Sequence, residues 1–295
     1  MVAKKNWKQL ELKVRLLCAV SFLAMHLLPR KAQRLIGEII ALALHKKIRQ
    51  KGIAQKNIER CFPGYSANQV QNLLKKNAVS KGVSIFDWGV GLFWSDKKIK
   101  THVLHRVEGL EHLQCKNGRG VLLLMKHSQH MLLDGRILGI YSYIHHISRD
   151  LKTSRYLNDK YKKARSLGAK GGVIQPHEPI KLLRWLKGGK IVLYAPDHDY
   201  GLKHSENCMF FNAPAATVTA PFKLAKATNC RVCILNSYYD EQDCLVLTIR
   251  ELAHLDRECQ KRFLQQMNDA IAHDITQHPH EYHWEYKRFK SMNIY

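Results

Sequence analysis

Acidic residues are scarce in this sequence. Its 295 residues include 24 Asp and Glu against 48 Lys and Arg, so the formal net charge is +24. Hydrophobic residues make up 45% of the chain, enough to bury a core, which excludes global disorder. The basic excess indicates an anionic partner, and the charge alone leaves nucleic acid, anionic lipid and an acidic protein as candidates.

Several motifs that would define a binding function are also missing. The chain contains neither G-x-x-x-x-G-K nor a well-placed G-x-G-x-x-G, and it has no recognisable zinc finger, RNA-recognition core motif or K-homology loop. Eight scattered cysteines form no disulfide framework, and the one C-x-x-C, at Cys230 and Cys233, has no second pair at zinc spacing. We therefore expect no nucleic-acid partner, no metal, and free, mostly buried thiols.

Long apolar runs are lacking as well. The N-terminal run at residues 16–28 is about 13 residues long, short of the ~20 that a transmembrane helix needs, and a second run at 36–44 follows a charged break. No small-residue cleavage site follows the first run. Basic residues precede it, namely Lys4, Lys5, Lys8, Lys13 and Arg15. We predict that residues 1–45 form a hydrophobic helical anchor that associates with the membrane as an interfacial helix pair; an amphipathic helix packed on the domain is the alternative.

Residues 46–295 show the alternation that is typical of an α/β domain. Short apolar runs indicate buried strands at residues 120–125, 190–195, 232–235 and 244–249. Helical spacing occurs at residues 69–86, where Ser66 can cap the helix, at 132–147 and at 255–275. We predict a single domain of the α/β class, with a mixed, mostly parallel central sheet flanked by helices.

Polar side chains follow the first two of these predicted strands. His127 comes directly after the first strand, and ligands of α/β folds bind beyond the carboxyl ends of strands, so His127 is a candidate general base. Asp197, Asp199 and Tyr200 lie in a polar turn after the second strand. In an extended chain the two Asp side chains would point to opposite sides, so only one need face a site. A surface histidine and a solvated turn are the alternative interpretations.

A basic segment lies between these two turns. Its cationic residues are Arg149, Lys152, Arg155, Lys160, Lys162, Lys163, Arg165 and Lys170. Arginine matches the geometry of a phosphate group through paired hydrogen bonds, so the arginines of this segment are candidates for substrate binding. A solvated helix face would show the same pattern.

Taken in order, these segments resemble the lipid A biosynthesis lauroyl/myristoyl acyltransferases of the lysophospholipid acyltransferase superfamily. The matching elements are N-I…C-F-P (57–63), V-E-G-L-E-H-L (107–113), the block from His127 to Gly139, P-D-H-D-Y-G (196–201, similar to the family's P-D-Q-D-Y-G), F-F…P-A…T (210–217) and E-Y…W…R-F-K (281–290). Any one element is a weak signal, but six in the right order over residues 46–290 are specific.

The resemblance implies an acyltransferase domain over residues 46–295 and a function in lipopolysaccharide biosynthesis. His127 would remove a proton from a hydroxyl group of a phosphorylated glycolipid, the lipid A precursor, and the oxygen would attack a thioester of acyl carrier protein. The resemblance also implies that the enzyme acts at the cytoplasmic face of the inner membrane, in contact with membrane lipids, and that it uses no metal or organic cofactor. The candidate substrate-binding residues are Arg136, Arg149, Arg155, Arg165, Asp197, Asp199 and Tyr200.

The chain departs from the family at one position. In the family an acidic residue five positions after the histidine orients the imidazole, and here that position is Leu132. Loss of such a carboxylate costs about four orders of magnitude in rate in a serine protease triad. Asp134 could replace it if the helix starts late, or His130 and Asp134, at i and i+4, could form the working pair. Alternatively, the chain is a relative that binds lipid or carrier protein without efficient turnover.

Overall fold

The computed structural model describes residues 2–44, 51–115, 118–151, 153–175 and 178–295. They are organised around a sheet with strand order β1-β9-β8-β2-β5-β3-β4. Its strands are β1 (His105–Glu108), β2 (Val121–Met125), β3 (Ile144–Ile147), β4 (Gly172–Ile174), β5 (Ile191–Tyr194), β8 (Arg231–Tyr239) and β9 (Leu245–Glu251). Strands β8 and β9 pair antiparallel and the other neighbours pair parallel. The prediction of an α/β fold with a mostly parallel sheet is confirmed.

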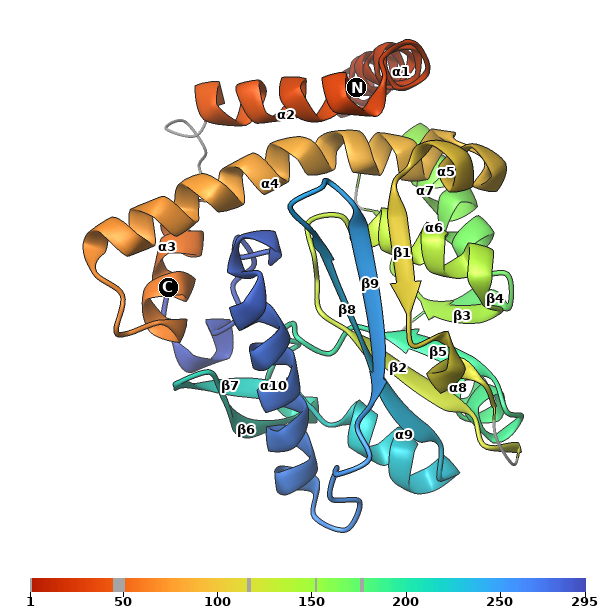
Figure 1. Ribbon diagram of the computed structural model, residues 1–295, viewed down its shortest axis with the longest axis vertical. Coiled ribbons are helices and arrows are strands. Elements are labelled where there is room, and N and C mark those ends of the chain that lie inside the picture. The colour runs from red at the N-terminus through yellow and green to blue at the C-terminus, as the bar shows by residue number, and fades with distance from the viewer. Residues whose placement is uncertain (1, 45–50, 116–117, 152, 176–177) are drawn as a thin grey trace.

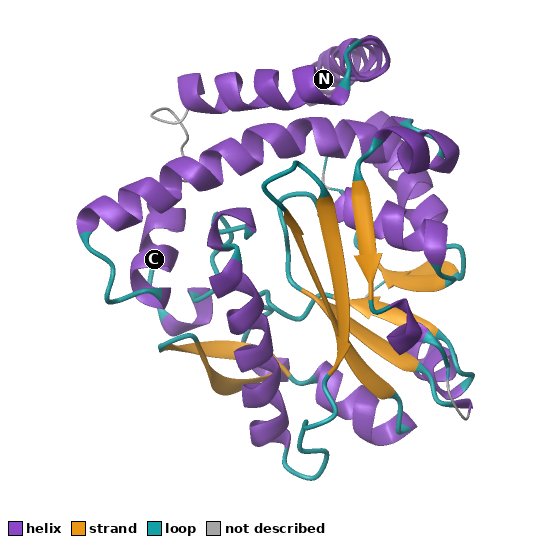
Figure 2. Ribbon diagram, in the orientation of Figure 1, coloured by secondary structure: helices purple, strands orange, loops and turns teal. Residues whose placement is uncertain are grey.

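Helices cover the sheet on its sides and along one end (Figures 1 and 2). They are α1 (Val2–Leu27), α2 (Arg30–Leu44), α3 (Lys51–Cys61), α4 (Ala67–Phe93), α5 (Asp96–His102), α6 (Met131–Tyr141), α7 (Arg155–Gly168), α8 (Pro179–Lys187), α9 (Ala220–Thr228) and α10 (Gln260–Gln277). A small antiparallel hairpin, β6 (Ser205–Phe210) with β7 (Ala213–Val218), packs beside α10. The C-terminal segment after α10 begins with the short helix η5 (Pro279–Glu281).

Strand β2 is buried on both faces, which explains its uninterrupted apolar sequence. Leu122 and Leu124 belong to the hydrophobic core that includes α9 and α10, whereas Val121, Leu123 and Met125 belong to the core that includes α6. All five side chains are at most 2% exposed. Complete burial of one such side chain stabilises the folded state by about 1.5–3 kcal/mol, so β2 holds the residues that follow it in a fixed position.

All three predicted helices have different bounds in the structure, and the one predicted at 255–275 is α10, Gln260–Gln277. The predicted helix at 132–147 ends with α6 at Tyr141, and Ile144–Ile147 form β3, which pairs with β5. A buried parallel strand and a turn of a buried helix both have an apolar sequence without interruption. Periodicity alone therefore cannot distinguish the strand from the helix. The predicted helix at 69–86 extends to Ala67–Phe93, and Ser66 caps it as expected, with its Oγ accepting from the Gln69 backbone N–H.

The N-terminal helices stack outside α4, at the end of the sheet (Figure 1). Close contact between α2 and α4 requires glycine, because a Cβ added to Gly37 would lie 2.6 Å from the Gly82 carbonyl oxygen. The outer faces of α1 and α2 expose large apolar side chains, including Leu12, Leu16, Leu17, Val20, Leu23, Leu27, Leu35, Ile39 and Leu42.

Residues 2–44 of the predicted hydrophobic anchor form α1 and α2, whose outer faces expose apolar side chains, and their association with a membrane stays a prediction. Among the described residues, no helix combines the length and the apolarity that crossing a bilayer would need. Of the basic residues predicted to face headgroups, Lys13 and Arg15 are exposed. The side chains of Lys4, Lys5 and Lys8, the predicted boundary at residues 45–46 and Lys152 of the basic segment lie outside the described residues.

Candidate active site

Parallel pairing of β2 with β5 brings His127 next to Asp197. Leu124 lies opposite Tyr194 in the register. His127 and Asp197, each three residues further along, therefore lie at the same edge of the sheet. His127 Nδ1 lies 2.6 Å from Asp197 Oδ1, and the His127 backbone N–H donates to Asp197 Oδ2 at 2.9 Å. Because a carboxylate can only accept, Nδ1 carries the proton and Nε2 keeps its lone pair, as a general base requires.

Asp197 remains ionised at the centre of this pair. It is fully buried. Burial alone would raise the pKa of its carboxyl group, but the charge and the hydrogen bonds of His127 outweigh burial and hold the pKa well below its usual value. Asp197 is thus the carboxylate in contact with His127, the contact that the sequence led us to expect from residue 132 or from Asp134.

Leu132 and Asp134 both point away from His127. Helix α6 begins at Met131, directly after His130, so residue 132 lies in the first turn. Leu132 is 2% exposed and packs against Gly91 of α4. Asp134 is buried and accepts hydrogen bonds from the Ser128 and Ser237 hydroxyl groups and from His130.

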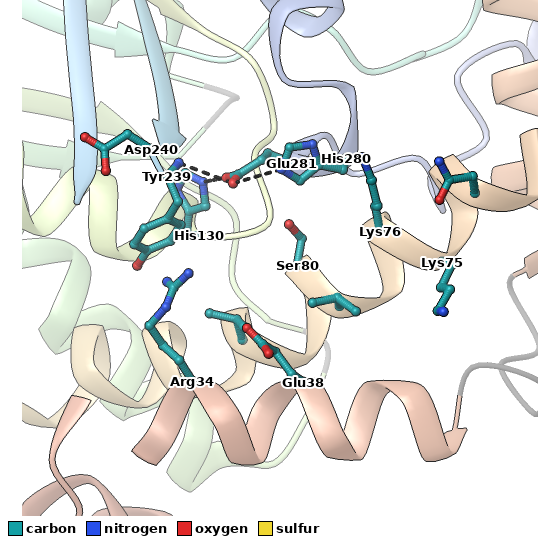
Figure 3. A pocket seen from close by; sticks show the side chains of 13 residues that line it. Arg34, Glu38, Lys75, Lys76, Ser80, His130, Tyr239, Asp240, His280 and Glu281 are labelled. Carbon is teal, nitrogen blue, oxygen red and sulfur yellow. Dashed lines mark hydrogen bonds and ion pairs between the residues drawn. The ribbon is translucent and has the colours of Figure 1, made fainter. Parts of the chain in front are cut away.

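His130 and Asp134 do form the expected i,i+4 contact, in a closed cluster. His130 Nδ1 lies 2.8 Å from Asp134, and His130 Nε2 lies 2.5 Å from Glu281. Burial alone would lower the pKa of His130, but the two carboxylates raise it to about 10. With both nitrogens protonated and bonded, the ring has no lone pair to accept a substrate proton, so the geometry argues against His130 as a base. Figure 3 shows His130 and Glu281 of this cluster at the wall of a cavity between α2 and α4, whose volume is about 470 Å³.

A different and larger cavity, of about 950 Å³, opens beside His127. Its apolar lining includes Ile147, Ile174, Leu182, Leu183, Leu193, Val218 and Leu224. The His127 side chain is 16% exposed, so it lies at the boundary between the buried sheet and this space. A cavity with a largely apolar lining and an imidazole in its wall can hold an alkyl chain with its reactive end next to a base.

Some of the predicted substrate-binding residues line this cavity. Arg149 lies over the ring of Tyr200, with its Cζ 5.0 Å from the ring centroid, and both side chains face the cavity. Arg165 also lines it and donates to the Ile147 carbonyl oxygen. The cavity therefore has a cationic edge next to its apolar wall.

The other predicted binding residues lie elsewhere or have structural partners. Arg136 is buried and donates to the carbonyl oxygens of Gly91 and Trp94, so it ties α6 to the end of α4. Arg155 is on the outer face of α7, where its side chain is 93% exposed. Asp199 is fully buried and accepts from the backbone N–H and hydroxyl of Ser291, so it anchors the C-terminal segment.

Two aromatic residues at the site were not singled out from the sequence. The ring of His198 stacks on His127, with centroids 3.4 Å apart, and on its other face lies Tyr286 at 3.6 Å. Both residues belong to elements that matched the family, which is the signal that could have found them.

His127, Asp197 and His198 each place a ligand atom within 4.8 Å of the others. A zinc ion binds about 2 Å from an imidazole nitrogen, near the ring plane, and two parallel planes 3.4 Å apart share no such position.

This geometry defines a class of protein. A histidine held by a buried aspartate can take a proton from a hydroxyl group, and the cavity beside it suits a long acyl chain with an anionic head. The site is therefore that of an enzyme that activates a hydroxyl group for transfer of an acyl chain.

Comparison with known proteins gives the family. The model of the bacterial lipid A biosynthesis acyltransferases matches residues 2–291, so the chain belongs to this family of acyltransferases. A lipid A biosynthesis acyltransferase of Haemophilus influenzae is 28% identical over 84% of this chain and 80% of its own length. The lipid A biosynthesis lauroyltransferase of Escherichia coli is 27% identical over 85% of this chain and 82% of its own length. A solved structure, the 1-acyl-sn-glycerophosphate acyltransferase of Thermotoga maritima, matches with a TM-score of 0.34 and 12% identity over 82% of this chain and 97% of that one.

Proposed function

We propose that this protein transfers a fatty acyl chain from acyl carrier protein to a hydroxyl group of a phosphorylated lipid A precursor, at the cytoplasmic face of the inner membrane. The observation that carries the proposal is the His127–Asp197 pair, whose His127 side chain lines the cavity. Membership of the lipid A acyltransferase family supports the reaction class and a glycolipid acceptor.

His127 acts as a general base and then as a general acid. Its Nε2 takes the proton of the acceptor hydroxyl while the oxygen attacks the thioester carbonyl carbon. The tetrahedral intermediate collapses with cleavage of the C–S bond, an ester forms, and the imidazolium returns its proton to the leaving thiolate. Asp197 stabilises the imidazolium throughout, as the buried aspartate does in a serine protease triad.

The surfaces around the cavity suit the three proposed partners. Arg149 and Lys290 at its edge can bind the phosphates of the acceptor. Helix α7 carries the exposed cations Arg155, Lys162 and Lys163 beside the cavity, which suits an acidic carrier protein. The apolar outer faces of α1 and α2 suit insertion into the interfacial layer of a membrane.

Incubation of the purified protein with an acyl carrier protein thioester and lipid A precursor tests the proposal. The wild-type protein should give an acylated product, detected by mass spectrometry, and His127→Ala should lose it. The control is His254→Ala, because His254 is exposed and does not line the cavity. If His127→Ala forms product at the wild-type rate, His127 is not the base.

A second candidate function rests on Leu132, which removes the family carboxylate. It is binding of lipid or carrier protein without turnover. It predicts that the wild-type protein binds the precursor in a sedimentation assay but that product stays at background. Measurable wild-type turnover excludes it.

A further inference from the structure

His127 is the outer ring of a three-ring stack. The planes of His127 and His198 are inclined by 7°, and those of His198 and Tyr286 by 8°. The three rings come from three segments: the end of β2, the turn after β5, and the C-terminal segment. That last segment is itself fixed to the site, because the His283 backbone N–H donates to the His127 carbonyl oxygen at 3.0 Å. The stack is therefore built by the tertiary fold.

His198 contributes an uncharged π face to this stack. Its burial, and then the nearby charge of His127, lower the pKa of His198 to about 2, so its ring is neutral at any working pH. Its Nε2 is buried and has no hydrogen-bond partner among the described residues. An unpaired buried nitrogen disfavours folding, so the stack is not explained by stability alone.

The chain departs from the family at two positions that bear on the base. The family element P-D-Q-D-Y-G has glutamine where this chain has His198, and the family carboxylate is Leu132 here. The Asp197 hydrogen bond fixes where His127 Nδ1 points but leaves the ring free to rock about that bond. A ring stacked on its face removes this freedom, and an imidazolium is stabilised over a neutral aromatic face.

We propose that His198, backed by Tyr286, is a positioning residue that holds the plane of His127 and stabilises its imidazolium during acyl transfer. This inference rests on the proposed function of the site. It explains how the site works with one carboxylate at the base and none at residue 132.

Other titratable groups also face the stack and must be held constant in a test. They are Asp197 from the turn after β5, Arg149 after β3, and Tyr282, His283, Glu285 and Arg288 from the C-terminal segment. A variant of His198 leaves all of them in place.

The kinetic test compares His198→Gln with His198→Phe. Gln is the family residue at this position, so the fold should tolerate it, but it offers no aromatic face. We expect His198→Gln to lower kcat about tenfold with little change in KM, and to move the acidic limb of the kcat/KM pH profile down by about half a pH unit to one unit. The limb moves down because a less stabilised imidazolium loses its proton at lower pH. His198→Phe restores the face and should recover kcat to within about threefold of wild type.

His283→Gln is the matched control. It removes a neighbouring imidazole whose ring is 6.4 Å from that of His198 and inclined by 46°, so it does not belong to the parallel stack. We expect its kcat to stay close to that of the wild type, because the three-ring stack remains in place. If His198→Gln matches the wild type in kcat and in pH profile, or if His198→Phe fails to recover activity while folding normally, the inference is refuted.

A readout independent of activity separates this inference from the proposed function. In protein with 13C-labelled histidine, ring currents should shift the His127 ring protons upfield, and His198→Gln should reduce that shift while His198→Phe keeps it. If the wild-type protein shows the shift and His198→Gln reduces it, but the wild-type protein transfers no acyl group, the stack is supported and the proposed function is refuted. An unchanged shift in His198→Gln would show that the rings do not stack in solution, and would refute the inference whatever the activity.

Discussion

Replacement of Asp197 by Asn is the sharpest perturbation of the proposed base. The carboxylate accepts from the His127 ring at 2.6 Å and from the His127 backbone N–H at 2.9 Å, in a fully buried position. Asn has nearly the same shape and can still accept the backbone N–H through its oxygen, but its NH2 group then faces Nδ1. The imidazole must then adopt the other tautomer, in which Nδ1 accepts from the Asn NH2 group and Nε2 carries the proton. Nε2 therefore loses the lone pair that the reaction needs.

The size of the effect follows from the loss of that lone pair. The equivalent substitution in a serine protease triad lowers kcat about 10⁴-fold. We expect a fall of about 10³ to 10⁴ in kcat for Asp197→Asn, which corresponds to about 4–5.5 kcal/mol in the barrier, with KM changed little.

The assay is single-turnover transfer from acyl carrier protein thioester, followed by mass spectrometry. Asp87→Asn is a matched control, because Asp87 is equally buried but bonds to Arg30 and Tyr239, away from the cavity. Its kcat should stay within about threefold of wild type in the folded fraction. A folded Asp197→Asn protein that loses less than tenfold in kcat would refute the orienting role of Asp197.

Three further predictions concern the surroundings of the site. Leu132→Glu should lower the free energy of unfolding by about 3 kcal/mol or more in urea titrations, because it buries a charge against Gly91, and it should not raise kcat. Gly82→Ala would place a Cβ 2.1 Å from the Gly37 carbonyl oxygen, so α2 should separate from α4. We expect the free energy of unfolding to fall by about 1–3 kcal/mol and proteolysis in α2 to become faster. Two carboxylates raise the pKa of His130 to about 10 despite its burial, so its stabilising effect is complete below its unfolded pKa of ~6.5 and is lost as the pH rises through about 10. The difference in unfolding free energy between wild type and His130→Gln should therefore shrink between pH 7 and pH 10; a constant difference would show that His130 is neutral in the folded protein.

The sequence was most informative about the sheet. The runs at 121–125 and 191–195 contain no charged residue, and that pattern predicts buried parallel strands because both faces of such a sheet are covered. The sequence also predicted that His127 and the turn with Asp197 each follow one of these strands. The pairing of these two side chains could not be predicted, because it depends on the register between β2 and β5, which is set by packing over the whole sheet.

The position of Asp134 shows the limit of reasoning from helix geometry. The two-residue step from 132 to 134 correctly suggests a different helix face, but the partner of that face is the Ser237 hydroxyl on β8, more than a hundred residues away. The same holds for the stack on His127, whose third ring, Tyr286, comes from the C-terminal segment. Contacts between residues so far apart in the chain leave no local pattern in one sequence.

The most direct test of the central claim, that His127 with Asp197 makes this chain an active acyltransferase, is mass spectrometry of lipid A from matched cells. The cells would lack the protein, carry the wild type, or carry Asp197→Asn at an equal level. We predict lipid A with an additional acyl chain in the wild-type cells, and its loss both without the protein and with Asp197→Asn. Identical lipid A spectra with and without the wild-type protein would contradict the account.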